Sequence, residues 1–232
     1  MARAITLVES GGPRAKATLG ALPSAACHRV GVTGPPGVGK STLVGKLAAL
    51  SGRRGLKTAV VACDPVSPIS GGAFLGDRMR MLSTTGDDPH PFIRSMASPG
   101  PGADLPQAAL DAARILAAAG FVRVYFETPG SGQNDVGLAG RVDTVVVVLS
   151  PDLGDEYQLL KAGQLEVADI LVVNRADRPG AGAMAELLRQ EVHARSRGPS
   201  SEVALVSAVS GDGVEALFSA IEARAHNLEA KQ

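Results

Sequence analysis

Residues 34–41 read Gly34-Pro35-Pro36-Gly37-Val38-Gly39-Lys40-Ser41 and match the pattern GxxxxGK[ST]. The flanking sequence supplies the context that this pattern requires. Residues 29–33 (RVGVT) predict a buried strand before the loop, and residues 41–50 (STLVGKLAAL) predict a helix after it. A strand–loop–helix unit of this kind is typical of proteins that cradle the phosphates of a nucleoside triphosphate.

The residue types of the loop explain how it would bind phosphate. Glycines let successive backbone N–H groups turn toward an anion, and the dipole of the following helix adds to the attraction. We expect Lys40 to reach the β- and γ-phosphates and the Ser41 hydroxyl to bind Mg²⁺. The residues expected to contact the nucleotide here are Gly34, Pro35, Pro36, Gly37, Val38, Gly39, Lys40, Ser41 and Thr42.

The rest of the chain alternates apolar runs with helical segments, which is typical of a parallel sheet. Several runs are continuous in Val, Ile and Leu, as expected for strands covered on both faces. The predicted strands are 29–33, 58–63, 122–127, 144–149, 170–174 and 203–207. The predicted helices are 41–50, 106–119, 155–165, 184–194 and 214–225, and residues 1–10 look like part of a short helix. The predicted fold class is α/β, a three-layer P-loop NTPase fold with a mainly parallel central sheet flanked by helices.

Composition narrows the classes of partner. The 232 residues are 45% apolar and 20% charged, which predicts a folded domain with a sizeable core. The 23 basic and 23 acidic residues give no net charge, so we expect neither nucleic acid nor membrane as a partner. No membrane-spanning stretch or signal peptide is visible, and Cys27 and Cys63 fit a reduced compartment, so a cytoplasmic location is expected.

Acidic residues occur at or after the ends of two predicted strands. Asp64 follows the strand 58–63, with Asp77 farther along, and Glu127 ends the strand 122–127. A carboxylate at this edge can bind Mg²⁺ or position an attacking water, although Asp64 and Asp77 could instead be turn or capping residues, a reading that position alone favours for Asp77. Gly130 lies three residues after Glu127, and its N–H could sense the γ-phosphate. No strand or helix is assigned to 64–104 or 128–140, and loops this long are usually functional.

Asn174-Arg175-Ala176-Asp177 resembles the guanine-reading motif NKxD. The Asp177 carboxylate could accept hydrogen bonds from N1–H and N2–H₂ of guanine, a donor pair that adenine lacks. Arg175 replaces the usual lysine, and an arginine can also stack on a ring. Ser207 and Ala208 follow the last strand, where they could contact the guanine carbonyl. Together these residues favour GTP over ATP.

These motifs together resemble the MeaB/ArgK group of P-loop GTPases, which includes the methylmalonic aciduria type A protein family. The resemblance covers nearly the whole chain. Beyond the phosphate loop it rests on DPVSPISGGAFLGDRMRM at 64–81, ETPGSGQND at 127–135, GDEYQLLKAG at 154–163, NRAD at 174–177 and SAVSGDGV at 207–214. The stretch 64–81 is the most specific of these segments.

The resemblance implies a GTPase chaperone for an adenosylcobalamin-dependent acyl-CoA mutase, such as methylmalonyl-CoA mutase or a close relative. Such a chaperone gates cofactor loading and protects the mutase. Carried over by position, the catalytic residues are Lys40, Asp64, Asp77, Glu127 and Lys161, and the Mg²⁺ ligands are Ser41, Asp64, Asp77 and Glu127. Gly130, Asn174, Arg175, Asp177, Ser207 and Ala208 complete the nucleotide site. Lys161 matches a lysine in the family's third switch.

The resemblance also suggests a domain division. Residues 1–27 would form a short N-terminal helical extension, residues 28–226 the P-loop GTPase domain and residues 227–232 a C-terminal tail. Family members usually carry a C-terminal dimerisation arm, which is absent here, so a homodimer is possible but in doubt. The family's ETVGVGQ becomes ETPGSGQ, and Pro129 removes a backbone donor and restricts the movement of this segment.

Two other functions stay open. A nickel-type metallochaperone GTPase would share the fold but needs a Cys/His cluster, and His28, His90, His193 and His226 lack ligand spacing. A P-loop small-molecule kinase would need an arginine-rich lid, for which Arg78, Arg80 and Arg94 are candidates, but would not need a guanine motif. The relative affinities for GTP and ATP, followed by hydrolysis without an acceptor, would separate the kinase from the GTPase.

Overall fold

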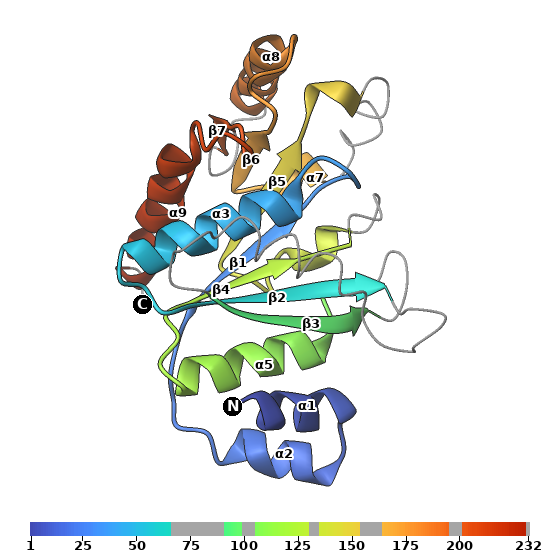
Figure 1. The fold of residues 1–232 in the computed structure, drawn as a ribbon, viewed down its shortest axis with the longest axis vertical. Helices are drawn as coiled ribbons and strands as arrows, with labels where there is room; N and C mark the ends of the chain where they lie inside the picture. Colours follow the sequence, from blue (N-terminus) through green and yellow to red (C-terminus); the bar gives the residue numbers. More distant parts are fainter. Residues whose placement is uncertain (66–90, 99–104, 130–134, 154–163, 195–200, 231–232) are drawn as a thin grey trace.

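The computed structural model describes residues 1–65, 91–98, 105–129, 135–153, 164–194 and 201–230. In this part of the chain, seven strands form one sheet in the order β3-β2-β4-β1-β5-β6-β7, and every neighbouring pair is parallel. The sheet runs from β3 at one edge to β7, which lies beside α8 (Figure 1). The predicted α/β fold with a parallel central sheet is therefore confirmed.

The strands are β1 (His28–Thr33), β2 (Thr58–Pro65), β3 (Phe92–Ser98), β4 (Arg123–Glu127), β5 (Thr144–Leu149), β6 (Ile170–Val173) and β7 (Glu202–Leu205). The α-helices are α1 (Ala2–Ser10), α2 (Pro13–Gly20), α3 (Lys40–Arg53), α5 (Gln107–Ala118), α7 (Gln164–Val167), α8 (Ala181–Ala194) and α9 (Val214–Glu229). Two short 3₁₀ helices are η1 (Asp135–Leu138) and η2 (Pro151–Leu153). Within the described ranges, no helix combines the length and the apolar character that crossing a membrane would demand.

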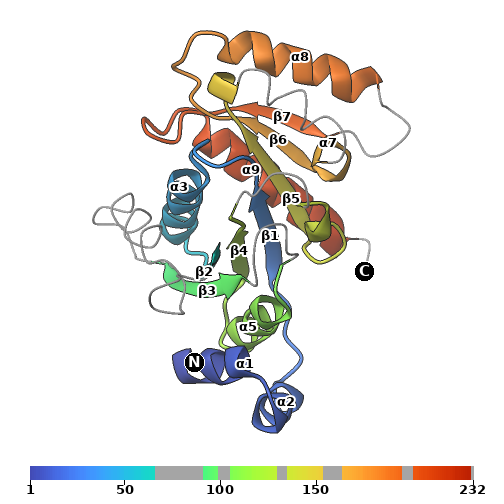
Figure 2. The same ribbon diagram turned by 90° about the vertical axis from the view of Figure 1, so that its right-hand side faces the viewer.

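Helices cover both faces of the sheet and so form three layers (Figure 2). Helices α3 and α9 pack on one face, where Val146 and Val148 of β5 point. Helices α5, α7 and α8 pack on the other face, together with Val145 and Val147. Because alternate residues of a strand point to opposite faces, a continuous valine run is what a doubly covered strand requires.

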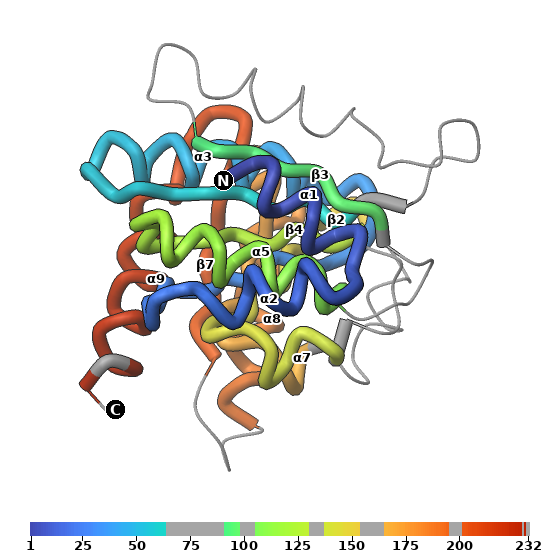
Figure 3. The backbone as a smooth tube through the Cα atoms, turned by 90° about the horizontal axis from the view of Figure 1, so that it is seen from below, coloured from blue at the N-terminus to red at the C-terminus, as the bar shows by residue number. Residues whose placement is uncertain are grey.

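The two N-terminal helices lie outside the three layers, next to α5 (Figure 3). Ile5 of α1 is fully buried, and Glu9 forms an ion pair with Arg94 of β3, with 2.5 Å between oxygen and nitrogen. The expected short helix at 1–10 is confirmed, whereas α2, which lies within the predicted helical extension 1–27, was not assigned as a separate helix. The division of the chain at residues 27 and 226 stays a prediction.

The structure differs from the sequence-based assignment most clearly at β3. Residues 92–98 lie in a region to which no strand was assigned, yet all of them pair with β2, from Ala59 to Pro65. Phe92-Ile93-Arg94-Ser95-Met96 mixes apolar and polar residues because β3 is an edge strand, with only Ile93 and Met96 buried. The predicted helix 155–165 lies almost wholly outside the described residues, and α7 begins at Gln164. The other predicted elements are present, with ends that differ by up to four residues.

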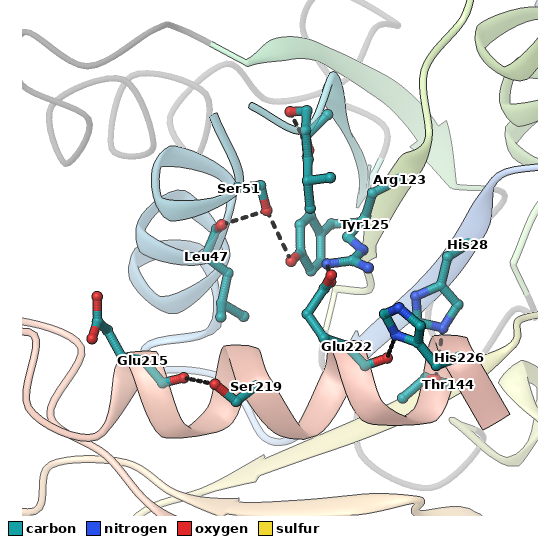
Figure 4. Close-up of polar contacts among 12 residues, drawn as sticks. His28, Leu47, Ser51, Arg123, Tyr125, Thr144, Glu215, Ser219, Glu222 and His226 are labelled. Atoms are coloured by element: carbon teal, nitrogen blue, oxygen red, sulfur yellow. Dashed lines mark hydrogen bonds and ion pairs between the residues drawn. The ribbon is translucent and has the colours of Figure 1, made fainter. Parts of the chain in front are cut away.

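A buried ion pair connects α9 with the amino-terminal edge of the sheet (Figure 4). Arg123, at the start of β4, is 4% exposed and pairs with Glu222 of α9. The guanidinium carbon of Arg123 also lies 5.7 Å from the ring centre of Phe218. Beside it, the buried Tyr125 hydroxyl is 3.3 Å from Oγ of Ser51 on α3. These contacts lie at the opposite edge from the loops that follow the strands.

Candidate functional site

A cavity of about 980 Å³ lies at the carboxyl-terminal edge of the sheet. Four segments that are distant in sequence line it: the phosphate loop, the end of β4 with residues 128 and 129, the segment 174–178 after β6, and the loop 207–212 after β7. Loops of a parallel sheet meet at this edge, which is where ligands bind in open α/β folds. The structure thus brings into one cavity most of the described residues that the sequence predicted for the nucleotide.

The phosphate loop rests directly on the backbone of the sheet. Gly34 has φ of 137°, and a Cβ atom added there would lie 2.0 Å from the carbonyl oxygen of Val148 in β5. Gly39 has φ of 95°, and its added Cβ would lie 2.5 Å from the side-chain nitrogen of Asn174. Only glycine fits these two positions, because each combines a left-handed backbone with a neighbour in close contact.

Lys40 opens α3 and is 6% exposed. Its Nζ donates to the carbonyl oxygens of Gly34 and Pro35, at 2.8 and 2.9 Å. Both acceptors belong to the loop, so the ammonium lies against the loop and beside the amino end of the helix. A buried cation and a helix N-terminus at one end of the cavity together favour an anionic group there.

Ser41 and Glu127 meet at the same end of the cavity. The Ser41 hydroxyl donates to Oε1 of Glu127 at 2.6 Å, and the two residues are 8% and 5% exposed. The contact arises because β1 and β4 are neighbours in the sheet, with Val32 opposite Glu127. A hydroxyl and a carboxylate are hard oxygen donors of the type that Mg²⁺ prefers, so this donor set fits the ion that the sequence predicted.

Of the other predicted metal and switch residues, Asp64 alone lies among the residues that the structure describes. Asp64 lies near the end of β2, opposite Ala97 of β3. Asp77, Gly130 and Lys161 lie outside the described residues. In the described part of the chain, no group of three or more His, Cys, Asp or Glu side chains is placed to hold a metal ion. The roles of these four residues stay predictions.

The Asn174 side chain forms hydrogen bonds with both the phosphate loop and the loop after β7. Its Nδ2 donates to the Val38 carbonyl at 2.7 Å, and its Oδ1 accepts from the backbone N–H of Ala208 at 2.9 Å. Next to it, the Ser207 hydroxyl donates to Oδ1 of Asp177 at 3.1 Å. The structure therefore brings together Asn174, Asp177, Ser207 and Ala208, as the two motifs predicted. It adds that Asn174 also positions the loops around it.

Arg175 makes contacts that its motif alone does not reveal. Its Nη2 donates to the Gly37 carbonyl at 2.5 Å, and its Nη1 pairs with the carboxylate of Asp152 in η2. Asp152 was not among the predicted site residues. Its position just beyond the end of β5 was a signal for it, since ligands in open α/β folds bind outside the carboxyl ends of the strands.

A second cavity, of about 560 Å³, lies at the amino-terminal edge of the sheet and includes Cys27 and His28 in its lining. Burial raises the pKa of the Cys27 thiol to about 11 and lowers the pKa of His28 to about 4, so both are uncharged at neutral pH. Arg29 and Asp143, also in the lining, neutralise each other at 2.6 Å. This cavity is therefore a much less favourable binding site for a phosphate group than the cavity beside Lys40.

Comparison with known proteins agrees with this geometry. A family model described as methylmalonyl Co-A mutase-associated GTPase MeaB matches residues 1–231. A putative GTPase of Pyrococcus horikoshii is 49% identical over 183 residues, which cover 78% of this chain and 57% of that protein. The chain thus spans a little more than half the length of that relative.

Two further similarities extend this comparison. The crystal structure of a LAO/AO transport system kinase matches 99% of this chain and 71% of its own, with a TM-score of 0.75 and 30% identity. A fused isobutyryl-CoA mutase of Cupriavidus metallidurans is 34% identical over 231 residues, which cover 94% of this chain and 21% of that protein.

Proposed function

We propose that this chain, which belongs to the MeaB family of GTPases, binds Mg²⁺–GTP in the cavity at the carboxyl edge of its sheet and hydrolyses it. The observation that carries the proposal is that a single cavity is lined by two sets of residues, which suit different parts of a guanine nucleotide. Lys40, Ser41 and Glu127 lie at one end, and the Asp177–Ser207 pair lies among the residues from the loops after β6 and β7. The first set suits phosphates and a cation, and the second suits guanine.

Each described residue has a specific task in this proposal. Lys40 and the backbone N–H groups of the loop would neutralise the β- and γ-phosphates. Ser41 and Glu127 would hold Mg²⁺, which when bound offsets the charge that develops on the phosphate oxygens. The resemblance adds Asp64, Asp77 and Lys161 as further acidic and switch residues and Gly130 as the sensor of the γ-phosphate. We keep residues 28–226 as the proposed GTPase domain and the cytoplasm as its proposed location.

Asp177→Asn tests the guanine assignment. The carboxylate accepts two N–H groups of guanine, whereas a carboxamide offers one acceptor and two donors. We expect the variant to bind GDP roughly 10- to 150-fold more weakly, as when one charged hydrogen bond is lost. Its affinity for xanthosine diphosphate should rise, since xanthine carries a carbonyl where guanine carries its amino group. Competition against a fluorescent nucleotide measures both affinities.

Asp212→Asn is the matched control for this test, because Asp212 lines the same cavity and pairs with the Ser210 hydroxyl. It should leave the ratio of the two affinities unchanged. Unaltered GDP binding by Asp177→Asn would contradict the assignment of Asp177 to the guanine site. A wild-type chain that binds ATP as tightly as GTP would remove guanine recognition altogether.

We further propose that the client is an adenosylcobalamin-dependent acyl-CoA mutase, whose cofactor loading the chain gates. The support is the family description and the fused mutase, a single protein in which a segment similar to nearly all of this chain occurs. Hydrolysis by the chain alone would then be slow, because the partner completes the site. Such completion is worth on the order of 10³–10⁵ in rate for phosphoryl transfer.

A binding assay with purified mutase subunits tests this client. We expect the affinity for the mutase to differ about 5- to 150-fold between the GDP form and the form with a non-hydrolysable GTP analogue, which is the usual range of coupling between two sites. An acyl-CoA enzyme without cobalamin is the control and should not bind. Failure to bind any cobalamin-dependent mutase in either nucleotide state would contradict the chaperone assignment but would leave GTP hydrolysis untouched.

A further inference from the structure

The backbone of Arg175 is held in a conformation that non-glycine residues rarely adopt. Its φ is 60°, the one positive value recorded for a non-glycine residue in the described part of the chain. The residues on either side are fixed by the sheet. The N–H of Asn174 donates to Leu149 at the end of β5, and the N–H of Ala176 donates to Val206 just after β7. Such a conformation persists only where the surroundings over-determine it, and it is commonest at functional sites.

This backbone lets the Arg175 side chain span two separate elements. One guanidinium nitrogen pairs with Asp152 of η2, and the other donates to Gly37 of the phosphate loop at 2.5 Å. A guanidinium can do this because its donors form a rigid planar fork, whereas a lysine ammonium is a compact point charge. The pairing with Asp152 therefore gives a physical reason for arginine at a position where the motif usually has lysine.

We propose that Asp152 is a positioning residue for nucleotide binding, which acts by holding the Arg175 guanidinium across the phosphate loop. The inference rests on the proposed guanine-nucleotide site. Arg175 lines the cavity beside Asn174 and Asp177, and Asp152 itself does not line it. Both terminal nitrogens of the Arg175 guanidinium already have partners, Asp152 and the Gly37 carbonyl. The side chain therefore loses less conformational freedom when a base and ribose lie against it. Affinity gained in this way comes from pre-organisation and needs no contact between Asp152 and the ligand.

The size of the effect follows from exposure. The Arg175 and Asp152 side chains are 38% and 45% exposed, so water and salt screen the pair. We expect Asp152→Asn to weaken GDP binding about two- to fivefold, the upper part of the range measured for exposed pairs. The same substitution in an Arg175→Ala background should change GDP affinity by less than about 1.5-fold, because its partner is gone. Asp152→Glu, which keeps the charge, should recover most of the affinity.

The measurements are GDP titration of the full chain, steady-state GTP hydrolysis and urea unfolding. Asp152→Asn should raise KM for GTP and leave kcat within about twofold, because Lys40, Ser41 and Glu127 are not in its contacts. The difference in GDP affinity between Asp152→Asn and wild type should become smaller at 1 M salt, because salt screens the Asp152–Arg175 pair. Glu186→Gln, which breaks the exposed pair with Arg189 on α8, is the control and should change neither KM nor kcat.

The following results would overturn the inference. Unchanged or tighter GDP binding by Asp152→Asn would mean that Asp152 does not position Arg175 for the nucleotide. An equal loss in the Arg175→Ala background would mean that Asp152 acts by another route, and a lower urea midpoint with an unchanged KM would make the pair structural only. If the wild-type chain binds no guanine nucleotide, the proposed function fails. If wild type binds GDP and Asp152→Asn binds it equally well, only this inference fails.

Discussion

Lys40→Ala is expected to weaken binding of GDP and GTP by roughly 30- to several thousand-fold, the range for removing one partner of a buried charge pair. Lys40 is 6% exposed, and its Nζ lies against the carbonyl oxygens of its own loop at the amino end of α3. Its loss removes the ammonium that would neutralise the β- and γ-phosphates alongside the backbone N–H groups and Mg²⁺. Calorimetric titration with GDP measures the change.

Lys46→Ala is the matched control, since Lys46 lies on the same helix but does not line the cavity. It should leave the GDP affinity within about twofold of wild type, as is usual for surface substitutions. Lys40→Arg keeps the positive charge and should recover part of the affinity. Urea unfolding of the Lys40→Ala chain separates lost binding from lost folding. Normal GDP binding by a folded Lys40→Ala chain would show that the phosphate loop has been assigned wrongly.

Glu222→Ala is expected to lower the free energy of unfolding by about 3 kcal/mol, the lower end of the range for breaking a buried ion pair. The substitution leaves the Arg123 guanidinium, which is 4% exposed, without its carboxylate. The lower end applies because the Glu222 side chain is 27% exposed, so water can partly replace it. Urea denaturation followed by circular dichroism measures the loss.

Glu215→Ala provides the comparison on the same helix. Glu215 pairs with Arg54, and both side chains are mostly exposed, so its loss should cost less than about 0.5 kcal/mol. Replacing both members of the buried pair, with Arg123→Met and Glu222→Leu, should restore much of the stability because no charge is left unpaired. GDP affinity should be unchanged in all three variants, since the pair is at the opposite edge of the sheet. Equal losses for Glu222→Ala and Glu215→Ala would contradict a buried role for Arg123.

Local patterns predicted most of the elements and the nucleotide motifs. The loop 34–41 needs only its own glycines and the strand and helix beside it, so its pattern is complete within about twenty residues. The runs at 58–63 and 144–149 were assigned as strands because both faces are apolar. β3 was missed for the converse reason, since an edge strand with Arg94 and Ser95 lacks that pattern and is stabilised by pairing with β2.

What the sequence indicated by itself is a nucleotide ligand, because the phosphate-loop pattern and the NKxD-like motif consist of particular residue types at short spacing. Only the tertiary structure decided which residues act together. The contacts of Ser41 with Glu127, of Asn174 with Val38 and Ala208, and of Asp152 with Arg175 join residues that lie between 23 and 136 positions apart. No local pattern encodes such pairs, since they arise when parallel strands in the order β4-β1-β5-β6-β7 bring their carboxyl ends to one edge.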